Sequence, residues 1–140
     1  MELASSDDEK MAIRFDPGEE VVSGLISFAK DSGIDAAFIS GIGSASEVEL
    51  GFYNALKKEY RKTVFTEPLE VLDMTGNLGL LDTEITVHLH GSFGRPNFEM
   101  LGGHIHRLVV NTTVEVMLDT MGGEMRRAYD EETGLNILSS

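Results

Sequence analysis

At Gly33 the spacing of the apolar residues in this 140-residue chain changes from a helical to a strand period. Before that point, Val22, Leu25, Ile26 and Ala29 recur every three or four positions, as on one face of an amphipathic helix. After it, apolar and polar residues alternate in short runs separated by Gly, Asn and Asp, which is typical of strands joined by turns. The pattern therefore predicts a helix near the N-terminus and a sheet built from the rest of the chain.

The residues around the helix predict where it begins and ends. Asp16 is expected to cap its N-terminus, with Pro17 at the first helical position and Glu19 completing a capping box. Gly33 is expected to end it, because glycine readily adopts the left-handed backbone conformation that closes a helix.

Strands are predicted on both sides of this helix. The alternating stretches are residues 11–16, 36–40, 47–53, 59–65, 69–75, 84–90, 103–109 and 113–118, with a final hairpin from 125–129 and 135–138. Gly41-Ile42-Gly43-Ser44 follows a strand as a phosphate loop does, but no Lys-Ser or Lys-Thr pair follows and the next segment reads as strand. A tight turn with close backbone approach is expected there. The fold class is α+β, a mostly antiparallel sheet with one or two packed helices.

The bulk composition is that of one compact domain. With 41% hydrophobic residues, the chain is apolar enough to bury a core. We assign residues 11–140 to the domain, and residues 1–10, which are acidic and show no period, to a flexible arm. No run approaches the roughly 18 apolar residues of a membrane span, and the acidic N-terminus is unlike a signal peptide. A cytoplasmic protein without membrane association is therefore expected.

The charge balance weighs against nucleic acid as a partner. The chain has 24 Asp and Glu against 11 Lys and Arg, a formal net charge of −13. Because affinity for nucleic acid comes largely from Lys and Arg at phosphates, such a chain could bind only through a local basic patch. The candidate is Lys57-Lys58-Glu59-Tyr60-Arg61-Lys62, which is more typical of a solvated hairpin end than of a binding face.

All four histidines lie in two short segments, Val87-His88-Leu89-His90-Gly91 and Gly102-Gly103-His104-Ile105-His106. With no cysteine in the chain, a metal site would have to use nitrogen and oxygen ligands. Side chains at i and i+2 of a strand share a face about 7 Å apart, and an antiparallel neighbour about 4.8 Å away can present a third imidazole to the same point. The alternative is a cluster that merely packs or lies exposed. Convergence of three or four imidazoles on one face favours a metal.

An ordered series of motifs resembles a known family. The series is Ile13-Arg14-Phe15-Asp16-Pro17-Gly18-Glu19-Glu20, Gly41-Ile42-Gly43-Ser44, Pro68-Leu69-Glu70-Val71-Leu72, Thr75-Gly76-Asn77, His88-Leu89-His90, Gly102-Gly103-His104-Ile105 and Ala128-Tyr129-Asp130-Glu131-Glu132-Thr133-Gly134-Leu135. Over residues 11–138 the chain resembles the PPC domain, named for its occurrence in plants and prokaryotes. Each motif alone is weak, but the order of the series makes the match specific.

The resemblance implies a free-standing subunit that assembles as a homotrimer. It also implies metal ligands: His88 and His90 match the His-x-His of the family, and His104 matches the histidine of its Gly-Gly-His. His106 stands where an aliphatic residue is usual, so it could be a fourth ligand, a partner of a ligand or a surface residue. Zinc is the first choice of metal, with nickel or iron able to occupy the same ligands.

Two classes of function remain open at this point. In plants such domains accompany AT-hook peptides in nuclear DNA-binding proteins, so the resemblance implies a DNA-binding or regulatory role. The acidity and the missing AT-hook weigh against direct duplex binding, and a regulatory or scaffolding role through protein contacts remains open. The alternative is a metal-dependent enzyme or a protein that binds a small anionic ligand or an ester. Three protein ligands leave a position open to water at zinc, and Glu70 or Glu84 could then act as a base, although a surface or core-edge position is more typical of each.

Two further features are expected to be structural. Phe93-Gly94-Arg95-Pro96 contains the Gly-Arg-Pro of an AT-hook core, but Phe93 stands where an arginine is required, so a turn is expected. Arg14 could receive an anionic ligand, but an ion pair with a carboxylate is the expected role.

Overall fold

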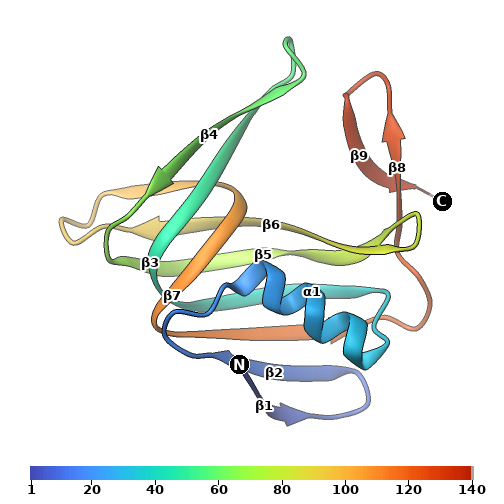
Figure 1. Ribbon diagram of the computed structural model, residues 1–140, viewed down its shortest axis with the longest axis horizontal. Helices are drawn as coiled ribbons and strands as arrows, with labels where there is room; N and C mark the ends of the chain where they lie inside the picture. Colours follow the sequence, from blue (N-terminus) through green and yellow to red (C-terminus); the bar gives the residue numbers. More distant parts are fainter. Residues whose placement is uncertain (140) are drawn as a thin grey trace.

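The computed structural model describes residues 1–139, and within them a single helix packs on a sheet of nine strands (Figure 1). The elements are β1 (Glu2–Ser6), β2 (Lys10–Phe15), α1 (Val21–Ser32), β3 (Ala37–Asn54), β4 (Glu59–Phe65), β5 (Leu69–Leu81), β6 (Glu84–Gly94), β7 (Met100–Thr120), β8 (Arg126–Asp130) and β9 (Leu135–Ser139). The expected architecture, a mostly antiparallel sheet with a packed helix in one domain, is confirmed.

The strand pairing brings β6 and β7 side by side. Neighbours in the sheet run β1-β2-β7-β3-β5-β8-β9, with β4 paired to β3 and β6 paired to both β5 and β7. All of these pairs are antiparallel except β5 with β8. Because β3, β5, β6 and β7 pair in a closed circuit, β6 has a hydrogen-bonded strand on each side. The two histidine-containing segments thus lie on adjacent strands.

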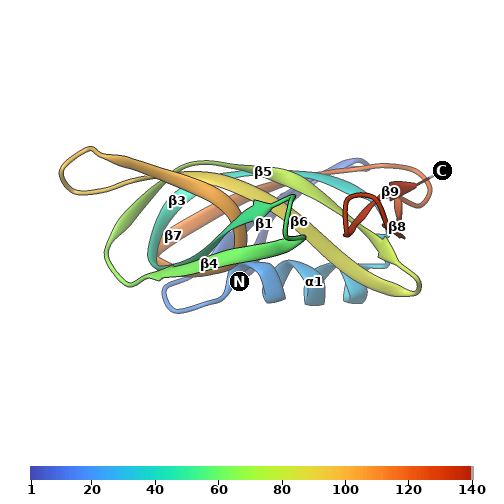
Figure 2. The same ribbon diagram turned by 90° about the horizontal axis from the view of Figure 1, so that it is seen from above.

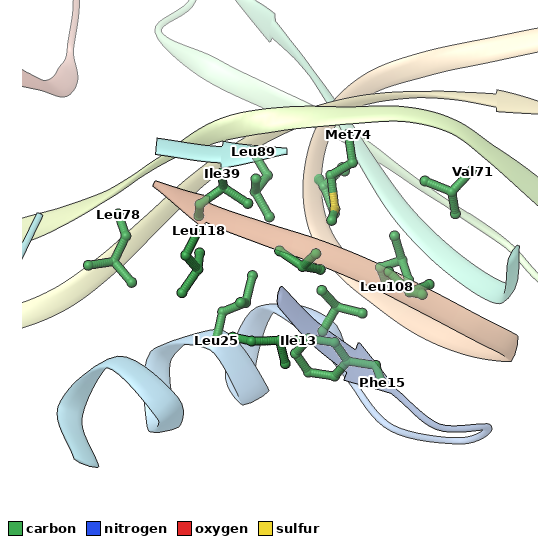
Figure 3. Packing of buried hydrophobic residues seen from close by; sticks show 14 of the residues in the cluster. Ile13, Phe15, Leu25, Ile39, Val71, Met74, Leu78, Leu89, Leu108 and Leu118 are labelled. Carbon is green, nitrogen blue, oxygen red and sulfur yellow. The ribbon is translucent and has the colours of Figure 1, made fainter. Parts of the chain in front are cut away.

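Helix α1 covers one face of the sheet (Figure 2). It buries Val21, Leu25 and Ala29 completely. Leu25 and Ala29 belong to the predicted apolar face, whereas Val22 and Ile26 of that face are only partly buried. Figure 3 shows Leu25 close to Ile13 and Phe15 of β2. Burial of a side chain of this size stabilises the fold by roughly 1.5–3 kcal/mol. In the described part of the chain, no helix combines the length and apolar character needed to cross a membrane.

The predicted C-terminal end of α1 is confirmed, and the predicted N-terminal cap is wrong. Gly33 ends the helix with φ 65°, as expected, and its N–H donates to the carbonyl groups of Ala29 and Lys30. The predicted N-cap, Asp16, is wrong, because Glu20 caps the helix instead. Residues 16–19 form a turn, in which the Gly18 N–H donates to the carbonyl of Val110 in β7 (3.0 Å). Gly18 has φ 84°, outside the right-handed helical region, so the helix cannot begin before it.

The predicted turn at Gly41-Ile42-Gly43-Ser44 is also wrong, because β3 runs through it as one strand. The register of β3 shifts there against both β5 and β7, which marks a bulge. The expected close backbone approach is confirmed. Gly43 has φ 151°, and a Cβ at this position would lie 2.2 Å from the carbonyl oxygen of Thr113.

Residues 1–10, expected to form an arm without regular structure, contain the edge strand β1. It pairs with β2, with Glu2 opposite Arg14 and Leu3 opposite Ile13. All five residues of β1 are exposed, so this strand has no buried face. The alternation that reveals a half-buried strand in a sequence is therefore absent, and only the backbone pairing identifies it.

Candidate metal centre

Three of the four histidines converge from the adjacent strands β6 and β7. His88 and His90 are two positions apart in β6 and so project to the same side, and His104 of β7 stands directly opposite His90 in the antiparallel register. One imidazole nitrogen from each of the three lies within 4.8 Å of the others. The structure thus brings together the three residues that the sequence selects as metal ligands, and their ligand role stays a prediction.

The local backbone around His88 is tightly packed. Its strand pairs with β5, where Asn77 stands opposite His88 and Gly76 opposite Leu89. A Cβ at Gly76 would lie 1.9 Å from the carbonyl oxygen of His88, so only glycine allows this approach of β5 to β6. The close pairing fixes the backbone from which His88 and His90 project.

The geometry of the imidazoles fits a divalent transition metal. Ring centroids are 5.1 Å apart for His88 and His90, 5.1 Å for His88 and His104, and 5.3 Å for His90 and His104. His88 and His104 are half-buried and His90 is exposed. Among residues 1–139, the buried Nδ1 of His104 has no hydrogen-bond partner. Since buried nitrogens are normally satisfied, that atom offers a lone pair for an ion or a donor.

The protein environment favours the neutral form of His88 and His104, which is the form that binds metals. Burial lowers the pKa of His104 to about 3, and the neighbouring imidazoles, led by that of His106, act in the same direction. Burial also lowers the pKa of His88, and the positive charge of Arg127 lowers it further. At neutral pH no proton has to be displaced from a charged His104 or His88 before a metal binds.

His106 packs beside the cluster without joining it. Its ring centroid lies 4.5 Å from that of His104 and 5.0 Å from that of Tyr60, edge-on to the tyrosine. A Cβ on Gly51 would come within 2.5 Å of its Nε2, so the ring is closely confined. The group of three nitrogens does not include it. Of the roles left open by the sequence, the half-buried His106 fits best as a neighbour that packs on a ligand.

A cavity of about 650 Å³ adjoins the cluster. His88 and His104 form part of its wall, together with Tyr60 of β4, residues of β5 and β6, and the β8–β9 hairpin. In Figure 1 this hairpin (red) stands beside the end of β5. The volume lies within the range of small-molecule sites. None of the residues that line it is an Asp or a Glu.

Arg127 is the residue of this site that the sequence does not reveal. Its Nη2 donates to Oδ1 of Asn77 and lies 3.4 Å from Nδ1 of His88, and its Nη1 donates to the carbonyl of Asn136 (3.1 Å). Its Nε is buried with no partner in the described residues, and burial lowers the pKa of the guanidinium. The predicted final hairpin is confirmed, but only the parallel pairing of β8 with β5 shows that Arg127 reaches His88.

The two glutamates considered as bases lie elsewhere. Glu84 accepts a hydrogen bond from Nζ of Lys30 (2.7 Å). Glu70 stands opposite Gly94 and lines a different pocket, which includes Phe98. Neither is among the residues that line the cavity beside the histidines, and Glu84, although it lies on β6 with His88, is paired with Lys30. No contact supports either glutamate as a base at the histidines.

Arg14 and the Gly-Arg-Pro stretch have the structural roles that the sequence predicts. Arg14 forms ion pairs with Glu2 (2.6 Å) and Asp16 (3.0 Å). The Gly-Arg-Pro stretch begins a turn at the end of β6, in which the Arg95 N–H donates to the Glu99 carbonyl (2.9 Å). The Arg95 side chain forms an ion pair with Glu67 (3.1 Å), so both arginines are already paired with carboxylates.

Comparison with known proteins gives a consistent result. The family model of the Plants and Prokaryotes Conserved (PCC) domain, the PPC domain described above, matches residues 3–122. No protein of curated function matches the chain.

Three solved structures cover nearly the whole chain. A protein from Bacteroides thetaiotaomicron, named as a DNA-binding candidate, has a TM-score of 0.93 at 30% identity, covering 96% of this chain and 94% of its own. A metal-containing protein from Archaeoglobus fulgidus has a TM-score of 0.88 at 32% identity, covering 100% and 99%. A PPC protein from Pyrococcus horikoshii has a TM-score of 0.87 at 28% identity, covering 100% and 98%.

Proposed function

The chain belongs to the Plants and Prokaryotes Conserved domain family, and from this premise we propose that it binds a divalent transition metal and a small ligand beside it. The observation that carries the proposal is the convergence of three imidazole nitrogens within 4.8 Å at the wall of a cavity of about 650 Å³. His88, His90 and His104 would hold the metal. Zinc is the first choice, and nickel or iron has the same ligand preference. The name of the Archaeoglobus fulgidus relative, a metal-containing protein, supports this role.

The position of the cluster favours ligand binding over a purely structural metal. Three protein ligands leave one position of a tetrahedral ion open, and His88 and His104 line the cavity from which a small molecule would approach. A metal at this place would polarise a ligand oxygen as a Lewis acid.

The alternative is that the protein is a metal-dependent enzyme, and the residues that line the cavity give this alternative less support. Hydrolysis would require a group that accepts a proton, and no Asp or Glu within residues 1–139 lines the cavity. Tyr60 is the lining residue with an ionisable hydroxyl, and burial raises its pKa, with the neighbouring Tyr53 adding to the effect. A tyrosine of raised pKa is a poor base at neutral pH, so binding is the better supported function.

The test of the metal site is elemental analysis of protein purified without a histidine tag or added metal. We expect about one equivalent of transition metal per chain in the wild type and loss of most of it in His90→Ala, because losing one of three ligands weakens the site strongly. His90 is exposed, so the substitution removes no buried packing. His106→Ala is the matched control and should keep the metal. A metal-free wild type, or full retention in His90→Ala, would contradict the proposal.

DNA binding is the second candidate, because the Bacteroides thetaiotaomicron relative is named for it. The net charge of −13 opposes it. A regulatory role through contacts with another protein is compatible with the same charge.

We also propose that the chain assembles as a homotrimer, as the family resemblance implies. Exposed apolar side chains offer surface for such contacts, among them Phe52, Phe98 and Met100, which are 68%, 93% and 66% exposed. Light scattering should report a particle of three 15.3 kDa chains, and a monomer would contradict this.

A further inference from the structure

The charge in the cavity beside the histidines is unlike that of the rest of the molecule. The chain carries a net charge of −13, yet the lining residues include Arg127 and no Asp or Glu. A divalent metal on His88, His90 and His104 would add two positive charges beside this guanidinium. Partly buried charges of one sign are costly without a counter-charge. Within residues 1–139 the lining supplies none, so an anionic ligand is the group that would provide the counter-charge.

The hydrogen bonds of Arg127 also favour an anionic ligand. Arginine can only donate, so its contact with His88 (Nη2 to Nδ1, 3.4 Å) requires that Nδ1 of His88 accept. A metal on Nδ1 takes that lone pair, and a metal on Nε2 places the proton of the neutral ring on Nδ1. In both cases metal binding ends the contact and leaves an N–H at Nη2 to be satisfied.

The second unsatisfied donor lies on the same edge of the guanidinium. Nε of Arg127 is buried and has no partner in the described residues. Nε and Nη2 form one edge of the planar group, and their two N–H bonds match the two oxygens of a carboxylate.

The remaining lining residues select the body of the ligand. Leu81, Val87 and Ile137 contribute apolar wall, and Arg127 is the single cationic side chain in the lining. A phosphate would need more donors than one guanidinium edge offers, whereas a monocarboxylate with an apolar body fits both parts of the cavity.

We propose that this cavity binds a small organic monocarboxylate, held by the Nε–Nη2 edge of Arg127 beside the metal, with its apolar body against Leu81, Val87 and Ile137. The inference rests on the metal site proposed above and assigns its ligand.

The hairpin that carries Arg127 is fixed in place. β8 pairs with β5 in parallel, with Arg127 opposite Leu81. At the other end of the hairpin, Lys58 donates from Nζ to the carbonyl of Glu131, and the hydroxyl of Tyr53 donates to the carbonyl of Thr133. These contacts hold Arg127 where it forms part of the cavity wall.

Isothermal titration calorimetry of zinc-loaded protein tests the assignment. The probes are 3-methylbutanoate, its neutral amide 3-methylbutanamide, and inorganic phosphate. We expect the carboxylate to bind at least about tenfold more tightly than the amide, and Arg127→Gln to lose at least about tenfold in carboxylate affinity, since hydrogen bonds to charged groups are strong. The carboxylate affinity of Arg127→Lys should lie between those of the wild type and Arg127→Gln, because lysine keeps the positive charge but lacks the two parallel N–H donors of the guanidinium.

The matched control is Arg126→Gln, in the adjacent position of the same strand. Arg126 is exposed and donates from Nε to Glu124 (2.7 Å), so carboxylate affinity should stay within about twofold of wild type. Zinc content and thermal unfolding of each variant are measured in parallel. Arg127→Gln is expected to keep its zinc, so a loss of carboxylate affinity is then assigned to the guanidinium.

The outcomes separate this inference from the proposed function. A wild type that contains no transition metal as purified and takes up none when zinc is added would overturn both. Zinc retained, with equal affinity for carboxylate and amide or with Arg127→Gln or Arg127→Lys equal to wild type, would overturn the carboxylate site alone. Tighter binding of phosphate than of 3-methylbutanoate would overturn the ligand class.

Discussion

His104 carries a neutral imidazole because of where its strand places it. β7 brings the ring into a half-buried position among His88, His90 and His106, and burial together with these neighbours lowers its pKa to about 3. A histidine in an unfolded chain titrates near 6.5. The same local environment that prepares the ring for a metal therefore makes the metal-free protein sensitive to acid.

The sign of this effect follows from the two pKa values. Below pH 6.5 the unfolded chain binds a proton at His104 that the folded protein does not, so the free energy of unfolding falls as the pH drops from about 6.5 towards 3. One proton contributes at most about 1.4 kcal/mol per pH unit, and solvent access to the ring reduces this.

Urea unfolding of the metal-free protein at pH 7.5 and pH 5.5 measures the effect. Stability should be lower at pH 5.5, and His104→Gln should show a smaller difference between the two values, because glutamine does not titrate. An identical pH dependence in wild type and variant would show that His104 is not the source.

At the scale of elements, Glu20 joins the helix to the sheet. Its carboxylate accepts hydrogen bonds from the N–H groups of Val22 (3.0 Å) and Ser23 (2.7 Å) in α1 and of Leu108 (3.1 Å) in β7. It therefore acts as the N-cap of α1 and as a link to the longest strand. A short polar side chain is the usual N-cap, and the longer glutamate suits this position because it also reaches β7.

Glu20→Ala should destabilise the protein by about 2–3 kcal/mol, since it removes a helix cap and leaves the N–H of Leu108 without its acceptor. Glu20→Gln, which keeps one acceptor oxygen, should lose less. Urea unfolding of the two variants measures both values. A loss in Glu20→Ala no larger than in Glu20→Gln would mean that the three hydrogen bonds contribute little.

At the scale of the whole molecule, charge decides which partners are accessible. The basic stretch at residues 57–62 lies at the tip and in the second strand of the β3–β4 hairpin, as one reading of the sequence predicts. Its charges are engaged within the protein: Lys57 pairs with Glu59, Lys62 with Glu49, and Arg61 lies over the ring of Phe52. The patch therefore adds little attraction for phosphates to a chain of net charge −13.

We predict no retardation of duplex DNA at an ionic strength of about 0.15 M in a gel-shift titration, because few phosphates can be neutralised. Clear retardation with a steep dependence on salt would overturn this prediction and restore DNA binding as the leading function.

The sequence by itself determined the features that repeat over short distances. The helical period before Gly33, the strand alternation after it, and the glycine at the end of α1 are local, so they could be predicted residue by residue. His88 and His90 could be placed on one face for the same reason, and the spacing to His104 suggested the antiparallel neighbour that the structure contains.

Tertiary structure alone decided what depends on pairing between distant segments. The bulge at Gly43 lets β3 pass close to the backbone of Thr113. The carboxylate of Glu20, which caps α1, accepts a hydrogen bond from the N–H of Leu108. The approach of Arg127 to His88 requires the parallel pairing of β8 with β5, a contact across 39 positions of the chain. Local periodicity carries no signal for such contacts, because it records which face of an element is buried and not which element covers it.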